Sequence, residues 1–442
     1  MTTRITTDNI TDGTITGSDL GAIANSAVQW QSVIIADGST QTTGVAGQGY
    51  FIDTTSATHT IVLPASPSVG DTIQIRDYSG TFGTNNVTLN VNGEKLAGTA
   101  ANGLIETNDS MVTLVYSGTT KGWLSVENEA KTNLVPATYI SATGGTITTS
   151  GDFKIHSFTG DGCFVVSTTG NVTDNPAGGP AVVDYLVVAG GGGGGAGDGG
   201  GGGAGGFRES HSTCVSGPYT ASPRATPTGL TLTATTYPVT VGAGGSGAAN
   251  CTACAGQGSD SIFSTITSAG GGFGASEPGT FPGGPAGKPG GSGGGAGNGG
   301  NRQEPGGTGN TPPVSPPQGS NGGAALDAGP LQANRAGAGG GGAITGGGTP
   351  GQDGNAGSGG NGTTTSIAGS PNGYSGGGGG GGRSSGGSGG PGGGGNGAGP
   401  GGTGGTGNPN TGGGGGAAGE GGGATGGAGG KGIVIIRYKF QN

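Results

Sequence analysis

The stretch VVDYLVVAGGGGGGAGDGGGGGAGGFRES, residues 182–210, passes from strand-forming residues into almost pure glycine without a linker. Glycine loses more backbone entropy on ordering than any other residue and offers no side chain to bury. An ordered structure made of such runs must therefore be stabilised by something other than an apolar core. The problem concerns the whole chain, since 120 Gly and 24 Pro among 442 residues are about a third of it, a level typical of low-complexity or disordered sequence.

Two continuous apolar runs bound the glycine-rich part. Leu186 to Ala189 precedes it and Ile433 to Ile436 follows it, and such runs are typical of strands covered on both faces. A disordered tail has no reason to end in a buried strand. We therefore predict that VDYLVVA and GIVIIRY lie in one small β cluster that pins both ends of residues 189–432. Loop closure alone permits this length, but a structureless loop of that size is not expected in a compact domain.

Glycine runs can become ordered by packing backbone against backbone. The extended left-handed threefold helix rises about 3.1 Å per residue and points its backbone groups outward. Helices that carry only hydrogens can approach until each N–H meets a neighbour's C=O. Each bond contributes about 1 kcal/mol net against an ordering cost of about 1 to 2 kcal/mol per residue, so many runs must pack at once. We predict a lattice of packed polyglycine II helices over residues 189–432.

The glycine-dominated runs occur at 189–206, 242–249, 269–275, 283–301, 336–348, 351–362, 375–407 and 412–432. The segments between them contain most of the aromatic, charged and proline residues of this region, as turns between stacked runs would. Two alternatives remain open, namely true disorder and a collagen-like helix. Collagen is disfavoured because GGGGGGAGDGGGGG and AITGGGT keep no strict Gly-X-Y register.

The first 28 residues have an unusual spacing. Ile5, Ile10, Ile15 and Leu20 stand five apart among Thr, Asp, Asn and Gly, which fits neither a helix nor a strand. Several parallel copies could turn these residues inward around a common axis. Residues 1–28 are therefore expected to form an attachment or stalk segment in a trimer, with a disordered tail as the alternative.

The next segment has the pattern of a compact β domain. Val87, Leu89 and Val91 alternate with polar residues, and PASPSVGD, NGEK and SGTTKG supply turn chemistry. A β-sandwich or a β-prism-like unit is expected. Trp30 and Trp123 are expected to pack together at its base, and the alternative is that they are carbohydrate-stacking platforms. The predicted organisation is an N-terminal segment at 1–28, a β domain at 29–127, a linker at 128–138, a β segment at 139–188, the lattice at 189–432 and a closing strand at 433–442.

The histidines and cysteines offer little enzymatic chemistry. HSTC and CTAC place His211, Cys214, Cys251 and Cys254 in an H-x2-C and C-x2-C arrangement that tetrahedral zinc accepts. A disulfide from Cys214 to Cys251 or Cys254, and plain thiols, are both favoured over zinc, so no metal site is predicted. Cys163, within CFVV, is expected in the core. Chance matches to GxGxxG carry no information in glycine runs, and we expect no enzymatic activity and no cofactor.

The order of five motifs resembles a known family. YLVVAGGGGGG, GGFR, TYPVTVGAGG, SIFSTITSAGGG and GIVIIRY follow one another as in the glycine-rich domain of bacteriophage tail fibres and adhesins. ITDGTIT and GYFIDTTSATHTIVLPASPSVGDTIQIRDY are similar to fibre proteins of marine phages, especially those that infect cyanobacteria. The resemblance implies polyglycine II scaffolds that present variable loops to host surface receptors. It also implies a homotrimeric fibre in the virion, bound to a phage tail or baseplate protein.

A receptor-binding fibre would contact a bacterial outer-membrane protein or glycan through its inter-run loops. The candidate contacts are Phe281, Arg302, Arg335 and Tyr374, because exposed rings and guanidinium groups suit such contacts. The alternative for each residue is a turn position that covers the edge of the lattice. The alternative function is a purely structural fibre or matrix protein without receptor specificity, and a glycan-cleaving depolymerase is a weaker third possibility.

The charge of the chain and the distribution of its apolar residues argue against nucleic acid and membranes as partners. The net charge is -9 with only 9% charged residues, which does not provide the basic surface that nucleic acid binding requires. The start MTTRITTDNITDG lacks the apolar core of a signal peptide, and no stretch approaches the roughly 20 apolar residues that span a bilayer. Neither nucleic acid binding nor membrane insertion is expected, and release of a virion protein by lysis would account for the missing secretion signal.

Overall fold

The computed structural model describes residues 28–126, 137–172, 178–251, 253–276, 286–298, 303–326, 335–421 and 423–441. The chain divides into two compact units, Met1–Tyr139 with Gly170–Pro180 and Ile140–Thr169 with Ala181–Asn442. Regular structure in the described residues is nearly all β, and the single short helix there is α1 (Thr213–Ser216). This confirms the all-β prediction. The predicted stalk segment and most of the predicted linker lie outside the described residues.

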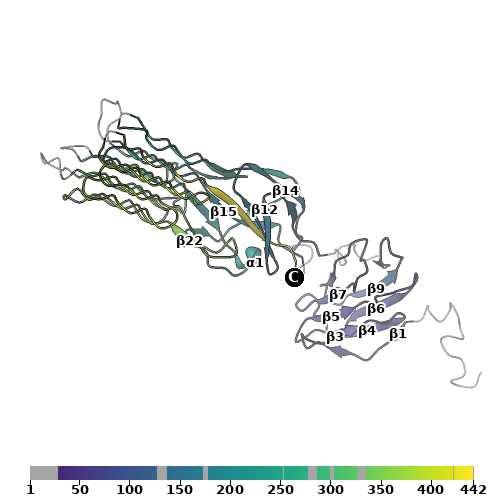
Figure 1. The fold of residues 1–442 in the computed structure, drawn as a ribbon. Coiled ribbons are helices and arrows are strands. Elements are labelled where there is room, and N and C mark those ends of the chain that lie inside the picture. Colours follow the sequence, from purple (N-terminus) through teal and green to yellow (C-terminus); the bar gives the residue numbers. More distant parts are fainter. Residues whose placement is uncertain are drawn as a thin grey trace, which may run out of the picture. The chain divides into compact units, whose positions relative to one another are not determined.

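The first unit consists of two β-sheets around one hydrophobic core (Figure 1). The six-stranded sheet has the order β1-β4-β6-β9-β10, with β2 also paired to β4, and the four-stranded sheet has the order β3-β5-β7-β8. The six-stranded sheet contains β1 (Gln29–Trp30), β2 (Ile34–Ile35), β4 (Gln48–Asp53), β6 (Thr72–Asp77), β9 (Met111–Tyr116) and β10 (Trp123–Ser125). The four-stranded sheet contains β3 (Gln41–Thr43), β5 (His59–Val62), β7 (Val87–Asn90) and β8 (Gly103–Ile105).

Consecutive strands from β2 to β7 alternate between these two sheets. Each strand therefore pairs in parallel with the strand two places along the chain, as β4 does with β6 and β5 with β7. The chain reverses direction at β8 and β9, which pair antiparallel to β7 and β6, and again at β10, which pairs antiparallel to β9. Alternate residues point inward, so Ile52, Ile73 and Ile75 are completely buried between the sheets. The two-sheet packing agrees with the predicted sandwich, whereas the parallel alternation is not visible in the sequence pattern.

The two tryptophans do not pack together, contrary to our expectation. They lie on β1 and β10, the opposite edge strands of the six-stranded sheet. Trp123 is fully buried and packs edge-to-face on Tyr116, with ring centroids 5.5 Å apart. Trp30 is 38% exposed and stacks on Phe51 instead. The expectation was wrong because sequence ends of a domain need not be neighbours in a sheet.

The second unit contains two larger sheets and a hairpin. One sheet has the order β11-β14-β19-β20-β21, the other has the order β12-β13-β24-β15-β16-β17 with β18 also paired to β15, and β22 pairs with β23. The first of these sheets contains β11 (Ser141–Thr143), β14 (Gly162–Thr168), β19 (Thr236–Thr240), β20 (Ser261–Phe263) and β21 (Ile266–Ser268). The other strands are β12 (Thr146–Ser150), β13 (Phe153–Phe158), β15 (Val182–Val188), β16 (Phe207–Ser210), β17 (Ala225–Thr226), β18 (Leu230–Thr231), β22 (Thr363–Thr365), β23 (Asn372–Tyr374) and β24 (Ile433–Lys439).

The two apolar runs that bound the glycine-rich part are neighbouring strands. β15 pairs antiparallel with β24, from Asp184 opposite Arg437 to Val188 opposite Ile433. This confirms the prediction that VDYLVVA and GIVIIRY lie in one β cluster. Cys163 on β14 is a correction, since it is exposed and the adjacent Phe164 is buried. The alternation of β14 places Phe164, not Cys163, on the core face.

The strands continue directly into the glycine runs, which extend away from the sheets (Figure 1). The first run after β15 spans residues 190–195. Its successive N–H groups donate to three different neighbouring runs, and each neighbour recurs at every third residue. The pairs are Gly190 with Ser259 and Gly193 with Gly256, Gly191 with Gly430 and Gly194 with Gly427, and Gly192 with Gly203 and Gly195 with Gly200, all at N···O distances of 2.9 or 3.0 Å.

The carbonyl groups of the same run accept hydrogen bonds with the same period of three residues. They accept from three further runs, through the pairs Gly271 with Gly190 and Gly274 with Gly193, Gly245 with Gly191 and Ala248 with Gly194, and Gly415 with Gly192 and Ala418 with Gly195. The run 190–195 therefore has six hydrogen-bonded neighbours. The run 376–382 has six as well, because it donates to runs at 392–398, 357–360 and 199–202 and accepts from runs at 337–340, 387–390 and 414–417.

This packing leaves no room for a Cβ atom at many of the interior glycines. A Cβ atom at Gly194 would lie 2.1 Å from the carbonyl oxygen of Gly416, which is far inside van der Waals contact. The obstacle is rigid backbone, which cannot move without breaking the hydrogen bonds of both runs. At Gly423, by contrast, a Cβ would meet nothing within 4 Å. Interior glycine is therefore a steric requirement of the packing, and it is not required at every position of the region.

The pair Gly194→Ala and Gly423→Ala tests this requirement with the same chemical change. Gly194→Ala should lower the free energy of unfolding of the second unit by about 1 to 3 kcal/mol, the usual cost of overpacking. Gly423→Ala should raise it by about 0.4 to 1 kcal/mol because alanine restricts the unfolded chain. Calorimetric unfolding of the full chain measures both. Equal effects of the two variants would mean that the runs are not closely packed.

Candidate functional site

The glycine runs end in a set of turns at the far end of the lattice from the sheets (Figure 1). We call these the distal turns. The turns with described residues at this end lie within 196–199, 249–254, 350–355, 383–385, 400–403 and 420–423. Five buried alanines pack together close to them, namely Ala196, Ala248, Ala255, Ala418 and Ala424. The distal turns therefore have a small apolar cluster of their own in addition to the hydrogen bonds of the runs.

Side chains and backbone groups tie several run ends to each other at this end. The N–H of Ala196 donates to the Ser276 hydroxyl at 3.2 Å, and this hydroxyl donates to the Ala253 carbonyl at 3.1 Å. The N–H of Asn298 donates to the Asp198 carbonyl at 3.2 Å. The ends of runs that are far apart in sequence thus meet at one surface.

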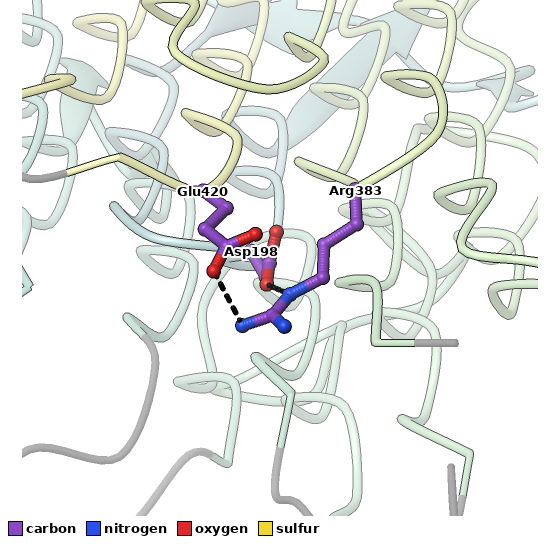
Figure 2. Close-up of polar contacts among 3 residues, drawn as sticks. All are labelled: Asp198, Arg383 and Glu420. Carbon is purple, nitrogen blue, oxygen red and sulfur yellow. Dashed lines mark hydrogen bonds and ion pairs between the residues drawn. The ribbon is translucent and has the colours of Figure 1, made fainter. Parts of the chain in front are cut away.

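Three charged side chains from three distal turns converge there, and Figure 2 shows them pointing toward one another. The guanidinium Nε of Arg383 donates to Oδ2 of Asp198 at 2.7 Å. Its Nη2 lies 3.0 Å from Oε1 of Glu420. We call Asp198, Arg383 and Glu420 the turn clamp. The clamp joins residues 196–199, 383–385 and 420–421, which share no sequence neighbourhood.

A tight turn at Gly197 and Asp198 brings the Asp198 carboxylate into the clamp. Its φ angle is +53°, in the left-handed region that aspartate tolerates better than most residues, and the preceding Gly197 has a φ angle of +60°. Two successive left-handed residues reverse the chain tightly between runs 190–195 and 199–206. The reversal directs the carboxylate inward, where the side chain has no solvent exposure.

The electrostatics of the clamp differ between its two carboxylates. The Asp198 side chain is 0% exposed and the Arg383 side chain 12%, so neither charge is well hydrated. The Glu420 side chain is 50% exposed and contributes as a surface partner. Moving the two turns apart would leave the Asp198 carboxylate buried without the Arg383 guanidinium, which is energetically costly. The Arg383–Asp198 pair should therefore fix the position of one turn relative to the other. The geometry therefore favours rigid presentation of these turns.

The four candidate contact residues have different positions. Phe281 and Arg302 lie outside the described residues. Arg335 is half-buried at the start of a run, and the next residue, Ala336, forms a β-bridge with Gly382 beside Arg383. Tyr374 is only 4% exposed and packs among the apolar side chains at the sheet end of the lattice, and burial raises its pKa to about 12. Tyr374 is thus a core position and has no accessible ring for a receptor.

His211 and Cys214 are not brought together with Cys251 and Cys254. All four cysteines are thiols. Cys214 lies in α1, which packs on β15 and β24, whereas Cys251 and Cys254 lie in a distal turn at the other end of run 242–248. His211 contacts Tyr219, with ring centroids 4.1 Å apart. In the part of the chain that the structure describes, no group of three or more His, Cys, Asp or Glu is placed to hold a metal ion.

A buried polar network near the sheets holds the segment that contains α1. Asp184 on β15 is completely buried and accepts hydrogen bonds from Ser210 Oγ, Ser212 N and Ser216 Oγ at 2.6 to 2.7 Å. Ser216 Oγ also lies 3.3 Å from His211 Nδ1. The carboxylate contacts the serine instead of the histidine, and Ser216 is buried, so the three residues do not have the arrangement of a catalytic triad.

Glu209 and Arg437 extend this network beneath the lattice. The Glu209 carboxylate is buried and accepts from Ser222 N at 3.0 Å and from Thr365 Oγ1 at 2.5 Å. Burial raises the pKa of Glu209, and the hydrogen bonds from Ser222 and Thr365 oppose this shift. Arg437 on β24 donates through Nε to the Ser216 carbonyl at 2.8 Å. These contacts anchor irregular segments to the sheets.

The sequence pattern did not identify the turn clamp. Asp198 and Arg383 are 185 residues apart, and no local periodicity links them. A usable signal did exist, because GDGG, GRSSGG and GEGG are isolated charges inside otherwise uncharged glycine runs. A charge in such a run needs either solvent or a partner.

Most of the second unit matches a known protein family. A family model described as a glycine-rich domain matches residues 166–439. A comparison with curated proteins gives no match. Among the described residues, no helix is long and apolar enough to cross a membrane.

Removal of Arg383 should destabilise the second unit more than removal of Glu420. Arg383→Ala leaves the Asp198 carboxylate buried without its ion-pair partner and should cost about 3 to 5 kcal/mol of unfolding free energy. Glu420→Ala removes a half-exposed partner and should cost less than about 1 kcal/mol. Denaturant unfolding of the full chain measures both changes.

A double variant separates loss of charge pairing from loss of packing. Asp198→Asn with Arg383→Gln removes both charges and keeps a residue that tolerates the left-handed turn. It should cost clearly less than Arg383→Ala alone. If Arg383→Ala and Glu420→Ala have the same small effect, the clamp does not hold the turns.

Proposed function

We propose that the chain, which belongs to the glycine-rich domain family, is a bacteriophage tail fibre protein that recognises a host bacterial surface receptor through its distal turns. The phage assignment depends on the resemblance of its motifs to tail fibres and adhesins. The observation that carries the proposal is the interlocked hydrogen bonding of the glycine runs, in which a central run has six neighbours. Such a scaffold holds the ends of many runs at one surface. A set of fixed, chemically varied turns suits recognition because ordering costs are met on folding and not on binding.

We infer that the scaffold is a bundle of polyglycine II helices. The threefold recurrence of hydrogen-bond partners supports this inference, because a helix with three residues per turn directs successive N–H groups in three directions. A β-ladder would instead use only two directions. The mixture of parallel and antiparallel neighbours is also compatible with such helices, since their side-chain-free surface is similar in both directions.

The distal turns are the proposed receptor-binding surface. The Arg335 backbone adjoins the turn clamp, because Ala336 pairs with Gly382 beside Arg383, and the half-exposed Glu420 carboxylate is the accessible member of the clamp. The sequence adds Phe281 and Arg302 as further candidate contacts. The proposed receptor is an outer-membrane protein or a surface glycan of the host, and the proposal includes no enzymatic step.

The virion location, the trimer and the attachment role of the N-terminal part are proposals that depend on the resemblance to phage fibre proteins. The isoleucine spacing of residues 1–28 also supports a trimer. A phage tail or baseplate protein is the expected partner at that end. The alternative is a structural fibre that contributes shape without receptor specificity.

Exchange of two distal turns and of the segment that contains Phe281 tests the receptor proposal. Residues 250–254, 350–355 and 277–285 are exchanged for Gly/Ser linkers of the same length, which leaves the described runs unchanged. The purified wild-type chain should compete with the phage for adsorption to host cells, and the exchanged chain should compete at least tenfold less well because receptor contacts are lost.

The matched control exchanges residues 408–411, a turn at the sheet end of the lattice, for a Gly/Ser linker of the same length. This change should leave competition unaltered. If the distal exchanges do not alter adsorption of phage that carry them but do alter particle shape, the structural alternative is favoured.

A further inference from the structure

The outer face of the six-stranded sheet in the first unit breaks the usual alternation of polar and apolar residues. On β4 and β6 the inward residues Ile52, Ile73 and Ile75 are buried in the core. The outward residue between two buried ones on β4 is Phe51, where a polar side chain would be expected on a solvated face. Phe51 therefore cannot be explained by the core.

Two further aromatic rings join Phe51 on this face. Trp30 on β1 stacks on Phe51 with ring centroids 4.4 Å apart and an interplanar angle of 24°. Tyr78, which directly follows β6, meets Phe51 edge-on at 6.4 Å. We call Trp30, Phe51 and Tyr78 the aromatic platform. Trp30 is 38% exposed and Tyr78 59%, so the platform presents its rings to solvent within this unit.

The backbone beneath the platform is shaped for the Trp30 ring. Gly49 lies opposite Trp30 in the parallel pairing of β1 with β4. A Cβ at Gly49 would lie 2.7 Å from the indole ring, so only glycine lets the ring lie flat over the sheet. The flat position restricts the Trp30 side chain and still leaves 38% of it exposed. An exposed ring that is held in this way indicates an interaction surface.

Planar polar side chains adjoin the rings. Arg76 lies opposite Phe51 on the neighbouring strand, and Gln74 lies opposite Gly49. The Arg76 guanidinium donates to the Asp109 carbonyl, which holds it against the sheet. Flat rings, a fixed guanidinium and an amide thus share one exposed face. This combination provides an apolar stacking surface together with hydrogen-bond donors.

A sugar ring is the partner that matches this chemistry. The face of an aromatic ring carries negative charge density and attracts the weakly positive C–H groups on the flat face of a pyranose. The hydroxyl groups at the sugar's edge can accept from Arg76 and exchange hydrogen bonds with Gln74. We propose that the aromatic platform binds a saccharide, with Trp30 as the principal stacking ring. The platform shares no residue with the distal turns, so this proposal does not depend on receptor recognition there.

Tryptophan fluorescence can test the platform directly. The chain has two tryptophans, and Trp123 is fully buried, so a saccharide-dependent change in emission reports Trp30. The probes are hexasaccharides of glucose, galactose, mannose and N-acetylglucosamine, added to the full chain. At least one of them should change the emission in a saturable way. Absence of a change with all four would overturn the proposal.

Two variants and a control identify the binding face. Tyr78→Ala, at an exposed position that keeps the reporter, should weaken binding of the active hexasaccharide at least threefold by fluorescence. Trp30→Ala should weaken it at least tenfold by calorimetry. Val69→Ala removes an exposed side chain from the turn at the opposite end of β6 and should leave binding unchanged.

The main competing possibility is that the platform is a contact between copies of the chain. Sedimentation velocity of the wild type, Tyr78→Ala and Trp30→Ala chains distinguishes the two. An unchanged association state with weakened saccharide binding supports the proposal. A lower association state in both variants, or saccharide binding that neither variant weakens, contradicts it.

Discussion

The structure depends on hydrogen bonds between backbones that touch directly, and this close approach requires glycine wherever a Cβ atom would point at a neighbouring run. The run 190–195 illustrates the constraint. The N–H of each of its residues donates to one neighbouring run, and the C=O of the same residue accepts from another. Glycine's high entropy cost is offset by the number of bonds that each run forms at once. The sheets at one end fix where the runs begin, since β15 and β24 lead directly into and out of the lattice. The high glycine content, which is typical of disordered sequences, is therefore what allows these runs to pack in an ordered way.

A scaffold without side chains must place its chemistry at its ends. At the sheet end, apolar strands and the network around Asp184 and Glu209 provide conventional packing. At the distal end, buried alanines and the turn clamp hold run ends that are remote in sequence. The first unit follows a different principle, with a two-sheet core and an aromatic platform on one outer face.

The features that could be predicted from the sequence were those that depend on the local pattern of apolar and polar residues. Continuous apolar runs at Leu186 and Ile433 were sufficient to predict that β15 and β24 lie in one β cluster, and alternation was sufficient to predict a compact β domain. Contacts between distant residues were not predictable in the same way. The Asp198–Arg383 pair, the opposite edges occupied by Trp30 and Trp123, and the parallel alternation of β2 to β7 depend on the spatial order of strands and runs. Cys163 was misplaced because CFVV does not by itself reveal which alternate residues face the core.

The central claim is that the amides of the glycine runs are paired with neighbouring runs along their whole length. Residue-resolved amide hydrogen exchange on the full chain measures this directly. We predict slow exchange at every residue of 190–195 and 376–382, without the alternation expected of an edge strand, and much faster exchange at Gln352 and Asp353 in the exposed distal turn at 350–355. Uniformly fast exchange through both runs would contradict the account, because it would mean that the glycine segments are solvated tethers and cannot hold the turns in place.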